Sequence, residues 1–251
     1  TVTISANTDT LIINGTIEVK GATQGGGVIL TATHIQLNDS TNINATGDLG
    51  GGYVLVGGDW QGGQYLESRL LPNQTINQAT TVTMSSGALI DVSAVINGDG
   101  GKVVLWSDLK NPDSVSVVHG SIYAKGGVLG GRGGNVETSA TSLDSHGAYV
   151  NTMAADGRAG SWLLDPWNLV IGTNGAADIV SALATSNVTI STTAGTSIRL
   201  DTSGNCSNCG DMVIQGAINY TGANSRTLTF KADSYISLTA SITSTNAALD
   251  V

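Results

Sequence analysis

The stretch INATGDLGGGYVL, residues 43–55, decides the fold of this chain. It contains two short runs with apolar residues at alternate or adjacent positions, which are typical of β-strands, on either side of a glycine cluster. Glycines in such a cluster permit a corner that needs positive φ or a close approach of neighbouring backbones. The stretch therefore predicts a strand, a corner and a second strand.

The same arrangement returns along the chain. The other copies are IEVKGATQGGGVIL at 17–30, IDVSAVINGDGGKVVL at 90–105, IYAKGGVLGGRGGNV at 122–136 and a weaker one, VNTMAADGRAGSWLL, at 150–164. The five copies start at 17, 43, 90, 122 and 150, so that successive starts differ by 26, 47, 32 and 28 residues. One such unit cannot bury its inner face alone, so this spacing predicts coils that stack in a solenoid.

Stacked coils would align the apolar residues next to each corner in inward ladders, at the strand spacing of about 4.8 Å. The expected inward residues are Val28, Leu30, Val54, Val103, Leu105 and Val136. With one Phe and 4% aromatic residues, the core must be aliphatic. We therefore predict an all-β fold, a parallel β-helix or β-solenoid. A β-sandwich would need hairpin turns, and only Asn14-Gly15 and Asn97-Gly98 are suitable dipeptides between strand-like runs.

The 47-residue interval predicts a loop inserted into one coil, from Gly58 to Thr80. Trp60, Tyr65 and Arg69 make this loop a candidate binding surface, because these residue types are enriched at binding hot spots. The alternative is that the two aromatic residues fold back and cover the side of the solenoid. A smaller excursion is expected from Asp108 to Ser114.

The pattern of glycine-cornered repeats ends near residue 165. Pro166 disfavours helix at Asp165 and lacks an amide donor, so residues 162–167 are expected to form a turn. The spacing of apolar residues predicts one short flanking helix near 176–186, and strand-like alternation then resumes. We divide the chain into a β-helix block at 1–164 and a second β-solenoid block at 165–251.

The charge of the chain weighs against two classes of partner. Its formal net charge is −9, its pI is near 4.5 and no basic cluster occurs, which weighs against nucleic acid and anionic membranes. No apolar run approaches the roughly 20 residues that span a bilayer. Thr1 does not begin a signal peptide, so we expect a segment excised from a longer chain.

Three longer phrases carry a family resemblance. ATGDLGGGYVLVGGDWQGG at 45–63 resembles the glycine-rich coil and extended loop of filamentous-haemagglutinin-like exoproteins, which are exported by two-partner secretion. GGNVETS at 133–139 followed by GSWLLDP at 160–166 is similar to a motif pair of those proteins and of the high-molecular-weight adhesins. The stretch from 187 to 251 resembles the repeats that follow.

The resemblance implies a right-handed parallel β-helix that is extracellular, at the bacterial cell surface or secreted, and that serves attachment. The implied partners are an outer-membrane transporter for the parent protein, a receptor on host cells, matrix, glycans or other bacteria, and neighbouring solenoid segments stacked coaxially. No counterpart of the amino-terminal secretion domain is found, so the segment is expected to be a non-catalytic part of the shaft or repeat region.

Two cysteines, Cys206 and Cys209, have the spacing of a redox or half-zinc motif. They lie in an Asn, Ser and Gly turn rather than at a helix start, and no second cysteine pair exists to complete a zinc site. We expect a structural disulfide and no metal or cofactor. A free thiol pair and a metal or redox site are the alternatives.

Two other functions compete with attachment. A polysaccharide lyase or hydrolase would need clustered carboxylates, but the acids are scattered and read as corner and surface residues. These acids are Asp91, Asp99, Asp108, Asp113, Glu137 and Asp144. A flat threonine array that binds ice or a crystalline surface would need aligned Thr-x-Thr runs, and their spacing is irregular. We expect neither function.

Asn-x-Ser/Thr sequons are the last candidate sites. They occur at Asn14, Asn38, Asn44, Asn73, Asn187, Asn205 and Asn219. Several would arise by chance in a chain this rich in Asn, Ser and Thr. Some relatives of the class are glycosylated at such sites, so these asparagines are candidate attachment points for glycans.

Overall fold

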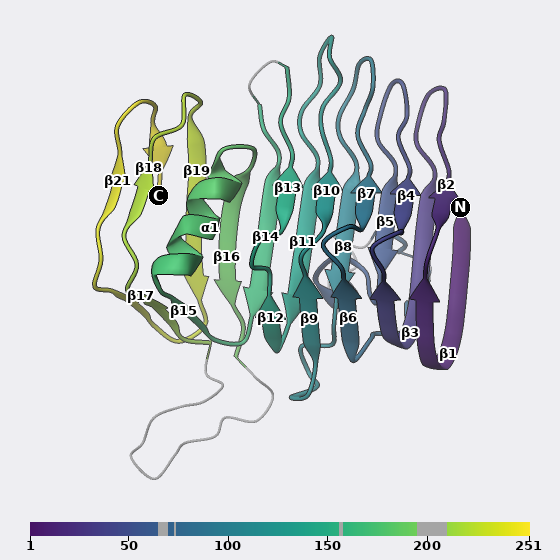
Figure 1. Ribbon diagram of the computed structural model, residues 1–251, viewed down its shortest axis with the longest axis horizontal. Helices are drawn as coiled ribbons and strands as arrows, with labels where there is room; N and C mark the ends of the chain where they lie inside the picture. Colours follow the sequence, from purple (N-terminus) through teal and green to yellow (C-terminus); the bar gives the residue numbers. More distant parts are fainter. Residues whose placement is uncertain (65–69, 73, 156–157, 195–209) are drawn as a thin grey trace.

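The computed structural model describes residues 1–64, 70–72, 74–155, 158–194 and 210–251. Every ladder between named strands in this part of the chain is parallel, and each strand pairs with strands of the neighbouring coils. Figure 1 shows the coils side by side from the amino-terminal strand to the carboxy-terminal one. The structure confirms the predicted parallel β-helix.

One sheet, which we call the long sheet, contains a strand from every coil. Its strands are β1 (Val2–Ile13), β3 (Gly27–Leu37), β5 (Tyr53–Val56), β8 (Lys102–Trp106), β11 (Asn135–Ala140), β14 (Ser161–Pro166), β16 (Asn187–Thr192), β19 (Arg226–Ala232) and β22 (Leu249–Asp250). The second half of β3 continues the sheet sideways into β6 (Thr81–Met84), β9 (Val115–Val118) and β12 (Ser142–Asp144).

The long sheet carries the predicted ladder on its inner face. Its register stacks Val28 on Val54, Val54 on Val103 and Val103 on Val136. These four side chains are fully buried, as are Leu30 and Leu105. All six residues expected to point inward do so, because alternate residues of a strand face the same side of the sheet.

A second sheet covers the core from the other side in the first five coils. It consists of β2 (Thr16–Glu18), β4 (Asn42–Asn44), β7 (Leu89–Asp91), β10 (Ser121–Tyr123) and β13 (Tyr149–Asn151). The middle residue of each strand points inward, and from β4 to β13 these residues are almost completely buried. The flanking residues form the outer face of this sheet, which we call the β2–β13 face.

The coils change after Pro166. A three-stranded sheet of β15 (Leu169–Ile171), β17 (Met212–Ile214) and β20 (Ile236–Leu238) begins, and β18 (Ile218–Tyr220) pairs with β21 (Ile242–Ser244). The helix α1 (Thr173–Leu183) packs between β13 and β18, in the place that a strand occupies in the other coils (Figure 1). Among the strands that the structure describes, only those of the long sheet pair across residue 165.

The helix begins and ends about three residues earlier than the sequence predicts. Ile179 and Leu183 are buried, as expected of its apolar face, and Val180 is half-buried. Arg226, itself buried, donates from Nε to the Leu183 carbonyl and from Nη2 to that of Ala184. The guanidinium satisfies carbonyls that lack helical partners, and a cation is favourable at this end of the helix dipole.

The turn predicted at 162–167 is wrong. Ser161–Pro166 is the strand β14, and Asp165 is a buried strand residue rather than a turn residue. Pro166 is the last residue of the strand, opposite Ala140, and its carbonyl accepts a hydrogen bond from the Thr193 amide at 3.1 Å. A proline at a strand end removes no donor from the middle of the ladder, so the strand tolerates it.

The glycine corners are the points at which neighbouring coils approach most closely. A Cβ atom on Gly51 would overlap the Val92 carbonyl oxygen, and one on Gly133 would overlap that of Thr152. Neither glycine has positive φ, so close approach is what requires glycine there. Positive φ occurs instead nearer the tips of the corners, at Gly98 (119°) and Gly131 (109°).

Candidate functional site

The inserted loop leaves the long sheet after Val56 and returns at Thr81. In the preceding coil, β3 crosses the same span without interruption, because Leu30 pairs with Val56 and His34 pairs with Thr81. The structure thus confirms the predicted insertion. A short 3₁₀ turn, η1 (Trp60–Gly63), opens the loop.

Asp59 organises the described part of this loop. Its side chain is buried and accepts hydrogen bonds from the amides of Trp60 (2.7 Å), Leu70 (3.0 Å) and Leu71 (3.3 Å). One carboxylate thus ties the start of the loop to a point eleven residues later. Sequence reasoning missed this residue; an aspartate directly before the aromatic residue of a loop was the available signal.

The loop covers the outer face of the long sheet. Ile29, Leu55 and Val104 form an outward row there, and all three are buried beneath a second hydrophobic cluster. That cluster also contains Ile76, Trp106, Leu109 and Trp167, with Tyr53, Trp60, Leu70 and Leu71 at its edge. Burial on both faces explains why strands of this sheet read as continuous apolar runs.

Two tryptophans fix the cover in place. The Trp106 ring is 1% exposed, and its Nε1 donates to Gln78 Oε1 of the loop at 3.1 Å. Trp167 Nε1 donates to the Leu109 carbonyl at 2.7 Å and so ties down the smaller excursion. Each ring supplies apolar area while its polar nitrogen reaches a partner, as buried tryptophans require.

Trp60, one of the three candidate binding residues, is half-buried at the edge of this cluster. The Lys102 ammonium lies 5.6 Å from the centre of its ring, a distance at which a cation and a ring attract. This placement favours the covering role for Trp60. Tyr65 and Arg69 lie outside the described residues, so the contact role of the loop stays a prediction.

A buried carboxyl group, Glu137, continues the outward row of Ile29, Leu55 and Val104. Its Oε2 accepts from the Gln61 amide at 2.8 Å and its Oε1 accepts from Ser139 Oγ at 3.0 Å. Gln61 has φ 49°, the one positive value among the described non-glycine residues, and its loop lies against the carboxyl group. Our expectation that Glu137 is a corner or surface residue is wrong, because the loop encloses it.

The pKa of Glu137 is raised to about 8: burial raises it most, the two hydrogen bonds lower it, and the nearby carboxylates of Asp165 and Asp59 add to the rise. Burial also raises the pKa of Asp165 to about 6, although Thr193 Oγ1 donates to it at 2.8 Å. At neutral pH the Glu137 side chain is therefore mainly a neutral acid beneath the loop.

This carboxyl group should make stability depend on pH. Folding raises the pKa of this glutamate from 4.5 to about 8. Its contribution to the free energy of unfolding is therefore largest below pH 4.5 and falls as the pH rises towards 8. The wild-type protein should lose several kcal/mol of unfolding free energy over this pH range, since one pKa unit corresponds to about 1.4 kcal/mol. Urea unfolding of Glu137→Gln at pH 5, 7 and 9 should show a flatter profile and higher stability at pH 9.

The control for this experiment is the exposed Asp113, because Asp113→Asn should follow the wild-type profile. A Glu137→Gln profile as steep as wild type would contradict the assignment.

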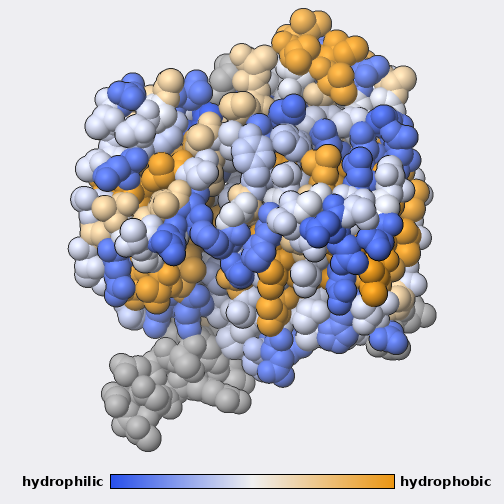
Figure 2. All heavy atoms as spheres, viewed as in Figure 1, coloured by the Kyte–Doolittle hydropathy of each residue, from blue (hydrophilic) through white to orange (hydrophobic). Residues whose placement is uncertain are grey.

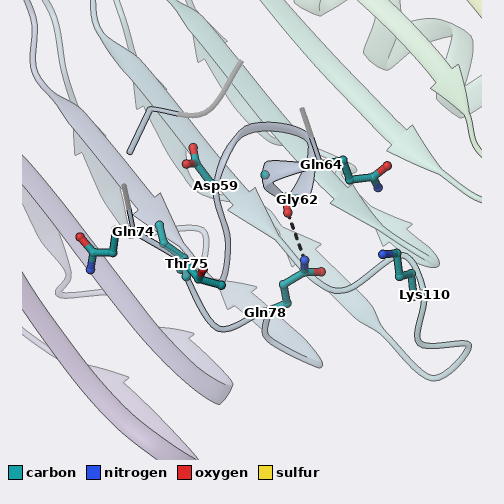
Figure 3. A pocket seen from close by; sticks show the side chains of 9 residues that line it. Asp59, Gly62, Gln64, Gln74, Thr75, Gln78 and Lys110 are labelled. Carbon is teal, nitrogen blue, oxygen red and sulfur yellow. Dashed lines mark hydrogen bonds between the residues drawn. The ribbon is translucent and has the colours of Figure 1, made fainter. Parts of the chain in front are cut away.

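A polar pocket of about 460 Å³ opens between the loop and the turn that carries Lys110. Figure 3 shows Gln78, whose Nε2 donates to the Gly62 carbonyl at 3.1 Å across this pocket. Gln64 and Gln74 stand at its rim. The Asp59 carboxylate in its wall is already bonded to loop amides, so the pocket lacks a free carboxylate from that residue.

The other scattered acids belong mostly to turns. Asp91, Asp108 and Asp144 each accept a hydrogen bond from the amide two residues further on, at 2.9, 2.9 and 3.0 Å. This Asx arrangement confirms the corner interpretation for these three. Within the described ranges, no group of three metal-ligating side chains occurs. The Thr-x-Thr runs also fail to align: Thr81 stands between His34 and Val115.

The sequons differ in their availability. Asn14 and Asn219 are exposed, whereas both ends of the Asn187 amide are occupied: Nδ2 donates to Ala159 and Oδ1 accepts from Thr227. Asn44 is half-buried and bonded to Thr46, and Asn38 is half-buried. Asn73, Asn205, Cys206 and Cys209 lie outside the described residues. Glycosylation and the disulfide stay predictions.

Comparison with solved structures shows a likeness in fold. No family model and no curated protein matches the chain. The fold is similar to the crystal structure of the HMW1 secretion domain from Haemophilus influenzae, with 25% sequence identity and a TM-score of 0.47. The match covers 65% of this chain and 42% of that one.

Across the described residues, no helix has the length and apolar character needed to cross a membrane.

Proposed function

We propose that the chain is a non-catalytic shaft segment of a secreted bacterial surface adhesin of the filamentous-haemagglutinin-like class. The long sheet carries this proposal, because its inward ladder continues from coil to coil and each coil contacts mainly its neighbours. A stack of this kind forms an extended body that positions whatever it carries. Its place would be outside the cell, at the surface or released from it.

The motif pair supports the same proposal. GGNVETS contributes β11 and GSWLLDP contributes β14, and these strands are direct neighbours in register. Val136 pairs with Trp162, and Ser139 pairs with Asp165. The two phrases therefore form consecutive rungs of one stack, a structural reason for them to occur together.

The proposed partners follow from the resemblance. They are an outer-membrane transporter for the parent protein, a receptor on host cells, matrix or other bacteria, and adjacent solenoid segments stacked end to end. The inserted loop is a candidate contact within this proposal. Its described part supports a covering role, so a contact role rests on Tyr65 and Arg69.

An in-register deletion in the parent protein tests the shaft role. Removing residues 27–52 takes out one coil and lets β1 meet β5 and β6, since both strands pair with β3 at positions equivalent to those of β1. Cells that carry the shortened protein should display it at near wild-type levels, because the remaining coils still stack in register. Surface labelling of intact cells measures the display.

Deletion of 27–37 alone is the matched control, because it removes the β3 strand and leaves half a coil out of register. This variant should lose surface display. The proposal is wrong if both deletions are displayed equally well, or if the purified chain depolymerises a polysaccharide.

A further inference from the structure

The β2–β13 face carries an aromatic side chain where three of the other coils carry a turn-forming one. The register aligns Glu18, Asn44, Asp91, Tyr123 and Asn151 in one outward row. Asn44, Asp91 and Asn151 each accept from the amide two residues on, at 3.1, 2.9 and 3.0 Å. This bond closes the turn after the strand. Tyrosine cannot make it, so Tyr123 departs from the local rule of the stack.

The neighbouring coil compensates for this departure. The Lys125 amide, which an Asx side chain at 123 would satisfy, donates instead to Ser93 Oγ at 3.0 Å. The fold therefore accommodates Tyr123 without needing it. Residues that break a local rule while the surroundings compensate are candidates for function.

Tyr123 belongs to a small platform on the outer face. Its ring centre lies 5.7 Å from that of Tyr149, with the planes tilted by 60°, and Tyr149 is 42% exposed. The Lys125 ammonium lies 5.4 Å from the Tyr123 ring, and no ion pair joins it to a carboxylate of the described residues. Two partly exposed rings with an adjacent ammonium offer an apolar surface edged by hydrogen-bond donors.

A groove of about 450 Å³ lies beside this platform and crosses four coils. Four of its lining residues, which we call the polar floor, come from three successive coils: Thr46, Asp91, Ser93 and Lys125. Met153 extends the lining to a fourth coil. The groove therefore runs along the axis of the stack. Asp91 uses Oδ1 in its turn, so Oδ2 remains able to accept from a ligand.

Apolar side chains of the glycine corners form the other wall. Val128 is 71% exposed and Val95 is 46% exposed. Figure 2 shows a hydrophobic patch at the top of the view, where Figure 1 draws the tips of the corners. The groove thus combines an apolar wall with a floor that holds one carboxylate and one ammonium and has no strong net charge.

We infer that this groove binds an extended, uncharged β-1,4-linked glycan that lies along the stack axis. The inference rests on the proposed role in attachment and names the site and the ligand class. A pyranose ring presents C–H groups on its faces and hydroxyls at its edges, which match the tyrosine platform and the polar floor. Each unit of such a chain advances by nearly the coil spacing of about 4.8 Å, so successive sugars meet successive coils.

Titration of the purified chain with cellohexaose and chitohexaose tests this inference. Calorimetry should detect binding of at least one of the two, and saturation-transfer NMR should place the ring C–H groups against the protein. Maltohexaose, a curved α-1,4 chain of the same units as cellohexaose, should bind at least about tenfold more weakly. Tyr123→Asn should weaken binding by at least about tenfold, the usual loss at a hot spot.

Tyr123→Asn is suited to this test because the coils of Asn44, Asp91 and Asn151 use Asn or Asp at this position, so its melting temperature should not fall. Asp91→Asn keeps the turn and removes the charge, and should weaken binding severalfold. Tyr235→Asn, an exposed tyrosine far from the groove, should bind as wild type.

The inference is overturned if neither hexaose binds, if maltohexaose binds equally well, or if Tyr123→Asn binds unchanged. Surface display separates this failure from failure of the proposed function. If Tyr123→Asn binds the hexaoses as wild type does, and the in-register coil deletion is displayed normally, the groove assignment is wrong and the shaft role stands.

Discussion

The Val103→Asp variant is expected to lose at least about 4 kcal/mol of unfolding free energy, because it places an unpaired carboxylate inside a closed apolar ladder. Val103 is fully buried between Val54 and Val136, so neither neighbour can hydrogen-bond the charge. Each coil is stabilised mainly by its neighbours, so a defect in the middle should open the coils on both sides.

Urea unfolding measures the loss, and hydrogen exchange of the amides of β5, β8 and β11 measures its spread. Val170→Asp is the matched control: Val170 is also the central residue of a strand, but it is 63% exposed, and the variant should stay within about 0.5 kcal/mol of wild type. If Val103→Asp and Val170→Asp unfold alike, the inward ladder does not hold the stack together.

The second large effect is expected at a glycine corner. Gly51→Ala should cost about 3 kcal/mol or more, because its Cβ would overlap the Val92 carbonyl oxygen and crowd the Gly101 amide of the next coil. These are backbone atoms and cannot rotate away, so the coils must separate locally. The expected result is a lower melting temperature. The amide of the next residue, Gly52, which donates to the Ala45 carbonyl, should also exchange its hydrogen faster.

Gly175→Ala tests whether the effect belongs to the corner or to loss of any glycine. Gly175 lies in α1, and a Cβ there would meet only ordinary contact at 3.6 Å from Ile171. Alanine favours helix over glycine, so this variant should match or exceed wild-type stability. An equal loss in Gly51→Ala and Gly175→Ala would mean that close approach at the corners is not the cause.

Much of the fold could be predicted from local pattern. The repeats located the coils, and the strand alternation identified Val28, Val54 and Val136 as inward residues. The 47-residue interval located the insertion. The turn predicted at 162–167 was wrong because a proline at a strand end and a proline in a turn have the same local sequence. Only pairing with β11 distinguishes them.

The candidate site could be predicted much less well. The positions of Asp59 in the loop and of Glu137 beneath it depend on how residues 57–64 fold over β11. Gln61 and Glu137, which meet there, are 76 residues apart in the sequence. The repeat alignment already puts Tyr123 at the same position as Asp91 and Asn151. It does not show that these residues face outward beside Tyr149, because that arrangement depends on the strands stacking in register.

The sequence by itself determined the parallel stack, its coil length and its inward ladder, because a periodic pattern of apolar residues and glycines has few ways to bury its inner face. The tertiary structure alone decided that corners such as Gly51 need close approach rather than positive φ. It also decided which outward residues are covered, as Glu137 is, and which remain available, as Tyr149 does. These properties depend on neighbouring coils and on the folding of an inserted loop, so local sequence does not encode them.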